Sequence, residues 1–173
     1  FPWYIVAYNY IHLFNAQKRI CIKSNEMKVT KSLKKSIFNK GFVIKSNENF
    51  EAVMRACSQI KRKHEDSTWI NEDFVQAYTN LHHLDIAFSI ECYLNEELVG
   101  GLYGLLIGNI FCGESMFAKV TDASKVAFYH LCQQAEENGI KLIDCQVYND
   151  HLASLGAYEI SREKYFEILN ENI

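Results

Sequence analysis

Two short clusters of polar residues interrupt apolar segments of this sequence and could do chemistry. In the first cluster, Asp144 and Gln146 lie near the end of the apolar run 140–147, so on a strand both side chains project from one face near its carboxyl end. Ligands of α/β layers gather at that end, and a carboxylate is costly to bury without partners. One interpretation is a binding or catalytic role, and the other is capping of the following turn at 149–151. The spacing alone leaves both open.

The second cluster lies within the segment Phe111–Met116. Gly113 would let a ligand approach the backbone, and Glu114 interrupts the apolar pattern of a strand. A β-bulge with an outward-pointing glutamate explains the same residues. Without further information, the bulge is the interpretation that we favour.

Motifs for nucleotide and metal chemistry are absent from the sequence. There is no Gly-x-x-x-x-Gly-Lys loop, no Gly-x-Gly-x-x-Gly and no His-Glu-x-x-His, and the 6 histidines lack metal-ligand spacing. The 6 cysteines are scattered without a Cys-x-x-Cys pair, which favours free, mostly buried thiols over disulfides or zinc. We therefore expect no metal site and no cofactor, and we disfavour nucleotide hydrolysis and zinc chemistry.

Hydrophobic periodicity predicts the elements that must hold these clusters. Apolar residues recur with helical spacing after Asn47 or Asn49, either of which could cap the helix, and again after Trp69, where Asn71 stands near the cap position. From residue 86 the pattern changes to strands separated by short turns, which is typical of an antiparallel meander. The three predicted strands are 86–94, 98–107 and 110–116.

The C-terminal part of the sequence alternates helical and strand patterns. Asp122 begins a helical segment that Gly139 ends, and the apolar run 140–147 then predicts a buried strand. A helix and a short apolar strand beside a meander predict a mixed α/β layer with a right-handed crossover, which places the chain in the α+β class. The elements predicted after it are a short helix or turn at 151–155, a strand at 157–160 and a helix capped by Ser161.

Charge is divided unevenly along the chain, which has 173 residues and a formal net charge of −3. Residues 17–63 carry 13 Lys or Arg against 3 Asp or Glu, whereas residues 64–173 carry 5 against 18. A positive run alone is most often a solvated surface. A charge reversal between two parts of a small protein strengthens the alternative that the basic part binds nucleic acid.

The start of the sequence has no recognisable targeting segment. No apolar run reaches the ~18 residues needed to cross a bilayer, and the opening from Phe1 to Tyr4 lacks the basic region and cleavage pattern of a signal peptide. We therefore expect a cytoplasmic protein without a membrane partner. Because the chain starts at Phe1 and not at Met, we also expect that an N-terminal segment is missing from this sequence.

Several strings of residues are more specific than the periodicity. The most specific are Phe111-Cys112-Gly113-Glu114-Ser115-Met116-Phe117 and Asp144-Cys145-Gln146. The others are the opening Phe-Pro-Trp, Thr68-Trp69-Ile70, Glu97–Gly104, Ala123-Ser124-Lys125, Leu142–Val147 and Asn149–Ala157. Together they resemble the leucyl/phenylalanyl-tRNA-protein transferase family, in the family's order and over nearly the whole chain. One departure is Leu84-Asp85, where the family usually has Leu-Gly.

The resemblance implies a fold, a division into domains and a reaction. We expect a small basic N-terminal α/β domain, incomplete at its start, in residues 1–63, and a catalytic domain with an acetyltransferase-like (GNAT) fold in residues 64–173. The implied reaction transfers Leu, Phe and less readily Met from aminoacyl-tRNA to the N-terminal Arg or Lys of acceptor proteins. This transfer marks the acceptors for N-end-rule degradation. The implied partners are aminoacyl-tRNA and those acceptor proteins.

By the same resemblance, Asp144 and Gln146 belong to the catalytic centre, with Glu114 and Asn149 in support. An aminoacyl ester is already activated, so the enzyme mainly has to bring an amine to the carbonyl and stabilise the developing oxyanion. We expect Asp144 to orient the attacking amine, directly or through Gln146, while Gln146 also contacts the ester.

The resemblance also implies three sets of binding residues. Trp69 and Trp3 are expected to stack on the terminal adenosine of the tRNA. The basic cluster of Lys31, Lys34 and Lys35 is expected to bind acceptor-stem phosphates, contacts that read no sequence. The residues expected to line the pocket for the amino acid side chain are Leu102, Phe111, Met116, Phe128, Ile143 and Val147.

Two other functions compete with this one. A GNAT N-acetyltransferase that uses acetyl-CoA would share the fold, but it needs a glycine-bearing pyrophosphate loop at the start of the central helix. The segment Val120–Lys125 has no glycine and carries an acid there. A nonenzymatic tRNA-binding module would explain the basic segment but would leave Asp144 and Gln146 without a purpose. The transferase is therefore the interpretation that we prefer.

Overall fold

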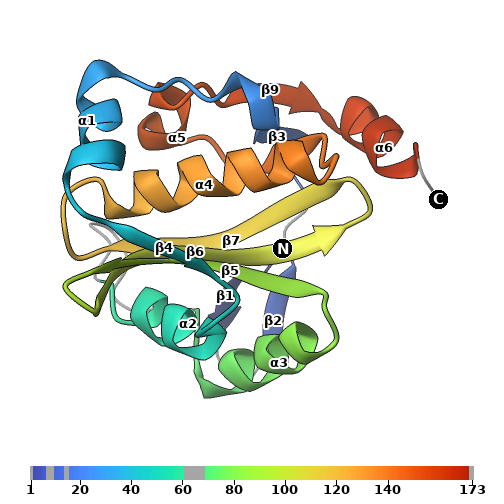
Figure 1. Cartoon of the computed structure of the whole chain (residues 1–173). Coiled ribbons are helices and arrows are strands. Elements are labelled where there is room, and N and C mark those ends of the chain that lie inside the picture. Colours follow the sequence, from blue (N-terminus) through green and yellow to red (C-terminus); the bar gives the residue numbers. More distant parts are fainter. Residues whose placement is uncertain (1, 7–9, 14–15, 61–68, 172–173) are drawn as a thin grey trace.

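The structure is a computed structural model, and it describes residues 2–6, 10–13, 16–60 and 69–171. These residues form a seven-stranded sheet with helices on both of its faces (Figure 1). A separate two-stranded sheet consists of β1 (Pro2–Val6) and β2 (Tyr10–Leu13).

The order of strands in the large sheet is β4-β5-β6-β7-β8-β3-β9. Its centre is the predicted antiparallel meander of β5 (Ala87–Leu94), β6 (Glu97–Ile107) and β7 (Ile110–Ala118). β8 (Leu142–Asp144) pairs in parallel with β7, and the chain reaches it through helix α4 (Ala123–Glu137). The predicted helix and short strand beside a meander are therefore confirmed.

The outer strands come from both ends of the chain. β4 (Val43–Ser46) pairs with β5 at one edge, and β3 (Lys18–Ile22) lies between β8 and β9 (Tyr158–Ser161) at the other. The sequence predicted β9 but neither β3 nor β4, whose 5 and 4 residues lie in a basic segment without a long apolar run to mark them.

The domain boundary expected between residues 63 and 64 falls in the segment 61–68, which lies outside the described residues. β3 and β4 come from before this boundary, and both hydrogen-bond to strands from after it. One sheet therefore draws strands from both sides of the expected boundary.

Helices cover the two faces of the sheet (Figure 1). α4 lies on one face with α1 (Lys31–Asn39) against it, and α2 (Phe50–Ser58) and α3 (Glu72–His83) lie on the other. Gly100 of β6 permits the close approach of α4, because a Cβ at this position would lie 2.5 Å from the Cβ of Ala123. Burial of the apolar side chains in these layers is the main stabilising contribution, at about 25 cal/mol per Å² removed from water.

The predicted helix starts are confirmed at α3 and at α6 (Arg162–Asn170). The side-chain oxygens of Asn71 and Ser161 accept hydrogen bonds from the N–H groups of Phe74 and Lys164 in the first turns. The short helix predicted near residues 151–155 is α5 (Asp150–Ser154).

β8 is shorter than the sequence predicted. The apolar run 140–147 predicted one continuous strand, but the strand ends at Asp144. Beyond it, the N–H of Cys145 donates to the carbonyl of Ile20 at 2.7 Å, and Gln146 has a φ of +68°. The chain therefore leaves β7 and turns along β3, a change of direction that a hydrophobic pattern does not record.

None of the 6 cysteines is in a disulfide, and all are buried or half-buried, as predicted. Within the described ranges, no helix combines the length and apolar character needed to cross a membrane. No group of three or more His, Cys, Asp or Glu residues in those ranges is placed to hold a metal ion.

Candidate active site

β7 and β8 separate at the point where the two polar clusters meet. Their parallel pairing runs from Ile110 and Leu142 to Cys112 and Asp144, and it ends there. β7 continues to Ala118, whereas the chain after Asp144 follows β3. We call this separation the β7–β8 split, and residues that follow the last pair on each side can reach each other across it.

Glu114 occupies a β-bulge on the β7 side of the split. Tyr103 of β6 pairs with Ser115, and the next residue, Gly104, pairs with Gly113, so Glu114 stands between consecutive pairs of the ladder. The bulge favoured from the sequence is therefore confirmed. A bulge turns its extra residue out of the regular alternation, which allows Glu114 to point at the split.

The carboxyl group of Glu114 is buried and hydrogen-bonded. The side-chain amide of Gln146 donates to its Oε2 at 3.1 Å, and Tyr78 faces the same carboxyl group. The outward orientation expected for this glutamate is wrong, since only 8% of the residue is exposed. Burial raises the pKa of Glu114 to about 7, although Gln146 and Tyr78 favour the ionised form. A carboxyl that titrates near neutral pH can exchange a proton during a reaction.

Asp144 is fully buried, and protein groups occupy both of its oxygens. Nη1 of Arg19 lies 2.6 Å from Oδ2, and the N–H of Gln146 donates to Oδ1 at 2.7 Å. Burial raises the pKa of Asp144, and the charge of Arg19 is the main opposing influence. The carboxylate of Asp144 therefore does cap a backbone N–H, as the capping alternative predicted. The N–H belongs to Gln146, however, and not to the turn at 149–151.

Asn149 caps that turn instead. Its Oδ1 accepts a hydrogen bond from the N–H of Leu152 at 2.8 Å, at the start of α5. The loop between Asp144 and Asn149 is thus anchored at both ends. The predicted supporting role of Asn149 remains a prediction.

Gln146 joins the two acids. Its backbone N–H binds Asp144 and its side-chain amide binds Glu114. The common face predicted for positions 144 and 146 of a regular strand does not apply, because β8 has ended before Gln146. A left-handed backbone costs a non-glycine residue about 1 kcal/mol, and the contacts to the two acids hold Gln146 in it.

Most of the predicted pocket residues pack together on the α4 face of the sheet. Leu102, Phe111, Phe128 and Ile143 belong to one buried cluster, and Met116 is partly buried against it. Val147 is half-buried and lies outside this cluster. Phe111 and Ile143 form the pair just before the end of the β7–β8 ladder, so this apolar cluster reaches the split from the α4 face, whereas Asp144 points to the opposite face.

The two tryptophans are placed to different degrees. Trp69 is half-buried beside the cluster beneath α2 and α3, and its ring meets that of Phe74 edge-on with centroids 5.2 Å apart. Trp3 lies in β1, and its side chain is outside the part that the structure describes.

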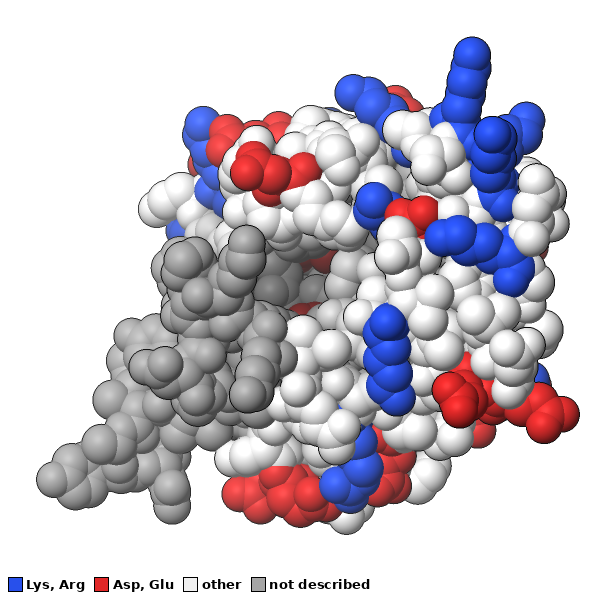
Figure 2. Space-filling view, turned by 90° about the vertical axis from the view of Figure 1, so that its left-hand side faces the viewer, with Lys and Arg blue, Asp and Glu red and all other residues white. Residues whose placement is uncertain are grey.

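The predicted phosphate-binding lysines share one helix. Lys31, Lys34 and Lys35 are exposed on α1, while Leu33 and Ser36 form its buried side. Figure 2 shows Lys and Arg side chains gathered on the upper right of the face, and a hollow beside them with acidic atoms in its depth. Figure 1 places α1 at the upper end of that same side.

A carboxylate immediately precedes the first turn of α4. Asp122 precedes the helix with a φ of +72°, accepts a 2.7 Å hydrogen bond from Ser36, and lies 3.4 Å from Lys125. The hydrogen bond from Ser36 is the main influence that lowers the pKa of Asp122. A permanently ionised carboxylate at this helix start opposes the binding of a second anion.

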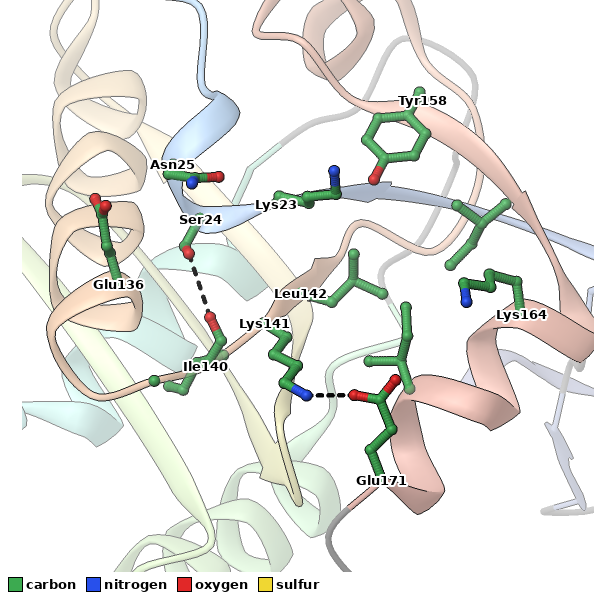
Figure 3. A pocket seen from close by; sticks show the side chains of 13 residues that line it. Lys23, Ser24, Asn25, Glu136, Ile140, Lys141, Leu142, Tyr158, Lys164 and Glu171 are labelled. Carbon is green, nitrogen blue, oxygen red and sulfur yellow. Dashed lines mark hydrogen bonds and ion pairs between the residues drawn. The ribbon is translucent and has the colours of Figure 1, made fainter.

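A cavity of about 590 Å³ lies near the opposite end of β8 (Figure 3). Leu142, Ile160 and Ile168 supply apolar walls, and Lys23, Lys141 and Lys164 stand around it. None of the predicted site residues lines this cavity. It is therefore separate from the β7–β8 split.

Sequence reasoning missed Arg19, Tyr78 and Tyr165 as partners of the two acids. They lie on β3, α3 and α6, far from the acids along the chain. Each is an ordinary residue of a short or amphipathic element, so no local pattern distinguishes it.

Comparison with protein families gives one match over most of the chain. The model described as leucyl/phenylalanyl-tRNA protein transferase matches residues 21–170. A leucyl/phenylalanyl-tRNA–protein transferase of Flavobacterium johnsoniae is 44% identical over 169 residues, which cover 98% of this chain and 79% of that protein. A protein of the same name from Nitrosospira multiformis is 43% identical and covers 99% of this chain and 73% of its own length.

Solved structures resemble the chain in fold. FemX matches with a TM-score of 0.66 at 10% identity, over 86% of this chain and 60% of FemX. A GCN5-related N-acetyltransferase from Kribbella flavida matches with a TM-score of 0.52 at 11% identity, over 82% of this chain and 54% of that one. The expected acetyltransferase-like (GNAT) fold is confirmed.

Proposed function

The chain belongs to the leucyl/phenylalanyl-tRNA protein transferase family, and on this basis we propose that it transfers Leu, Phe and less readily Met from aminoacyl-tRNA to proteins that begin with Arg or Lys. The new N-terminal residue marks the acceptor for N-end-rule degradation. Aminoacyl-tRNA is a cytoplasmic substrate, so we place this activity in the cytoplasm.

The observation that carries the proposal is the hydrogen bond from Gln146 to Glu114 beside the apolar cluster. An amide and a titratable carboxyl stand at the split, and the apolar cluster lies next to it. This combination suits a substrate that has an apolar side chain and an ester carbonyl attached to it.

The reaction needs little activation. The acceptor amine attacks the ester carbonyl, the bond to the ribose oxygen breaks, and the proton lost by the amine is balanced by one gained by that oxygen. At pH 7 about a tenth of an α-amine with a pKa near 8 is neutral. Glu114 is the acid best suited to take up the proton, because its pKa is raised to about 7 and it retains some exposure.

In this mechanism Asp144 acts through Gln146. Arg19 and the N–H of Gln146 occupy both oxygens of the buried carboxylate. This favours the expectation that Asp144 orients the attacking amine through Gln146 and not directly. The amide of Gln146 is then the group that meets the amine or the ester.

Binding of the two substrates follows the charge division. The lysines on α1 bind acceptor-stem phosphates, and Trp69 stacks on the terminal adenosine, because these are exposed cations and a half-buried ring. The acidic residues 64–173 attract a peptide that begins with Arg or Lys.

An acetyl-CoA-dependent activity is the second candidate, because the GNAT fold supports it. It is disfavoured by Asp122, whose ionised carboxylate stands at the start of α4 where a pyrophosphate would bind.

One experiment separates the candidates. The protein is incubated with labelled Leu-tRNA or labelled acetyl-CoA, each with a peptide that begins with Arg and a control peptide that begins with Glu. We expect label to move only from Leu-tRNA and only to the Arg peptide. Transfer from acetyl-CoA would contradict the proposal, and binding of tRNA without any transfer would indicate a tRNA-binding module.

A further inference from the structure

Arg19 and Tyr165 hold the buried carboxylate of Asp144 from outside the catalytic strings. Nη1 of Arg19 lies 2.6 Å from Oδ2 of Asp144, and the Arg19 side chain is only 14% exposed. Tyr165 of α6 is buried, and the guanidinium carbon of Arg19 lies 4.9 Å from the centre of its ring. Its hydroxyl lies 3.5 Å from Sγ of Cys112 and faces Asp144 closely enough to favour the ionised carboxylate.

These contacts determine which way the carboxylate points. With Oδ2 on Arg19, Oδ1 is turned to the N–H of Gln146 at 2.7 Å. Gln146 has a left-handed backbone, and its side-chain amide donates a hydrogen bond to Glu114 at 3.1 Å. A chain of direct contacts therefore runs from Tyr165 and Arg19 through Asp144 to Gln146.

We propose that Arg19 and Tyr165 are positioning residues, which act through Asp144 to keep Gln146 in its left-handed conformation with its amide on Glu114. The proposal deepens the proposed function and rests on it for the kinetic effects. The effect on the Gln146 backbone does not depend on any reaction.

The other groups around Asp144 explain why a charged residue, Arg19, is needed to hold its carboxylate. Neutral thiols and a second acid cannot favour an ionised carboxylate, whereas the guanidinium of Arg19 does so. The titratable or charged groups that face Asp144 are Arg19 and Cys21 from β3, Cys112 and Glu114 from β7, Tyr165 from α6, and the neighbouring Cys145.

The test uses Arg19→Met, Arg19→Lys and Tyr165→Phe, with Lys18→Met as the matched control. Lys18 lies on the same strand, but its ion pair with Glu159 is exposed. Two quantities are measured in each variant. One is the exchange rate of the backbone amide proton of Gln146 by NMR, and the other is the pH dependence of kcat with Leu-tRNA and an Arg peptide.

We expect Arg19→Met to speed exchange of the Gln146 backbone amide proton and to lower kcat most at acidic pH, because the loss of a close opposite charge raises the pKa of Asp144. The KM for Leu-tRNA stays unchanged. Arg19→Lys keeps the charge and restores part of both effects, Tyr165→Phe changes both in the same direction by less, and Lys18→Met changes neither.

Unchanged exchange and an unchanged kcat at acidic pH in Arg19→Met or Tyr165→Phe would overturn the proposal that these residues position Gln146. So would a loss confined to the KM for Leu-tRNA, which would make Arg19 a phosphate contact. If Arg19→Met does not fold, Arg19→Lys and Tyr165→Phe decide the question. If the wild-type protein transfers nothing, the proposed function fails, but exchange of the Gln146 backbone amide proton still tests whether Arg19 and Tyr165 position Gln146.

Discussion

The hydroxyl of Ser36 on α1 donates a 2.7 Å hydrogen bond to the carboxylate of Asp122 at the start of α4. Lys40 and Lys125 lie 3.6 Å and 3.4 Å from the same carboxylate. The bond ties the helix that carries the exposed lysines to the helix that helps to build the apolar cluster. It also fixes a negative charge at the start of α4, which opposes the binding of a second anion there.

Ser36→Ala is expected to lower the free energy of unfolding by about 1.5 kcal/mol or more, because it removes a buried hydrogen bond to a charged group. The pKa of Asp122 is lowered in the folded protein, so its contribution is present at neutral pH and is lost as the pH falls through that lowered value. Urea unfolding at neutral and acidic pH measures both effects. Ser32→Ala, at an exposed position of the same helix, is the control, and an equal loss there would contradict the assignment.

Glu114→Gln is expected to lower kcat about a hundredfold, the lower end of the range for removing a general acid or base. Because ionised Glu114 accepts the proton, wild-type turnover should rise as the pH passes its pKa of about 7. The variant should lose that limb and keep the one near 8 that belongs to the acceptor amine. A pH profile of kcat measures this, and a limb near 7 that survives the substitution would assign it to another group.

Asp144→Ala and Gln146→Ala are each expected to reduce turnover while the affinity for Leu-tRNA stays nearly unchanged. The reason is that the two residues form one hydrogen-bonded unit at 2.7 Å, set apart from the lysines of α1. Removing both should therefore cost little more than removing one. Steady-state kinetics and filter binding test this, and full activity of either variant would refute the assignment.

The double substitution Lys34→Ala and Lys35→Ala is expected to flatten the dependence of tRNA affinity on salt. Each lost phosphate contact reduces the slope of log affinity against log salt by about 0.7–0.9. Binding of tRNA between low and moderate salt gives the slope. The paired control is Lys45→Ala with Lys164→Ala, two exposed lysines on other elements, and an equal change in that control would mean that the effect is one of net charge.

Asp85→Gly is expected to stabilise the protein by about 0.5–1 kcal/mol, because a glycine adopts a left-handed backbone at less cost than any L-residue. Asp85 follows α3 with a φ of +56°, in the left-handed region that favours glycine after a helix. Thermal or urea unfolding measures the change. Asp85→Ala keeps a Cβ at this φ, so it should give no such gain, and an equal gain there would exclude the backbone explanation.

The sequence by itself determined most of the central fold. The meander of β5, β6 and β7 and helices α2, α3 and α4 were predictable because each is long enough to repeat a period of 2 or 3.6 residues against a buried face. The caps at Asn71 and Ser161 were predictable because a capping side chain contacts its own helix. The strings around Glu114 and Asp144 likewise marked the candidate site before its geometry was known.

Tertiary structure alone decided how those residues meet. β8 ends at Asp144 because the chain leaves β7 there while it stays hydrogen-bonded to β3, a strand more than a hundred residues earlier. The inward turn of Glu114 and the burial of Asp144 depend on Tyr78, Arg19 and Tyr165, which lie on other elements. Periodicity reports which face of a segment is buried, whereas the partner of a buried charge is set by packing between segments.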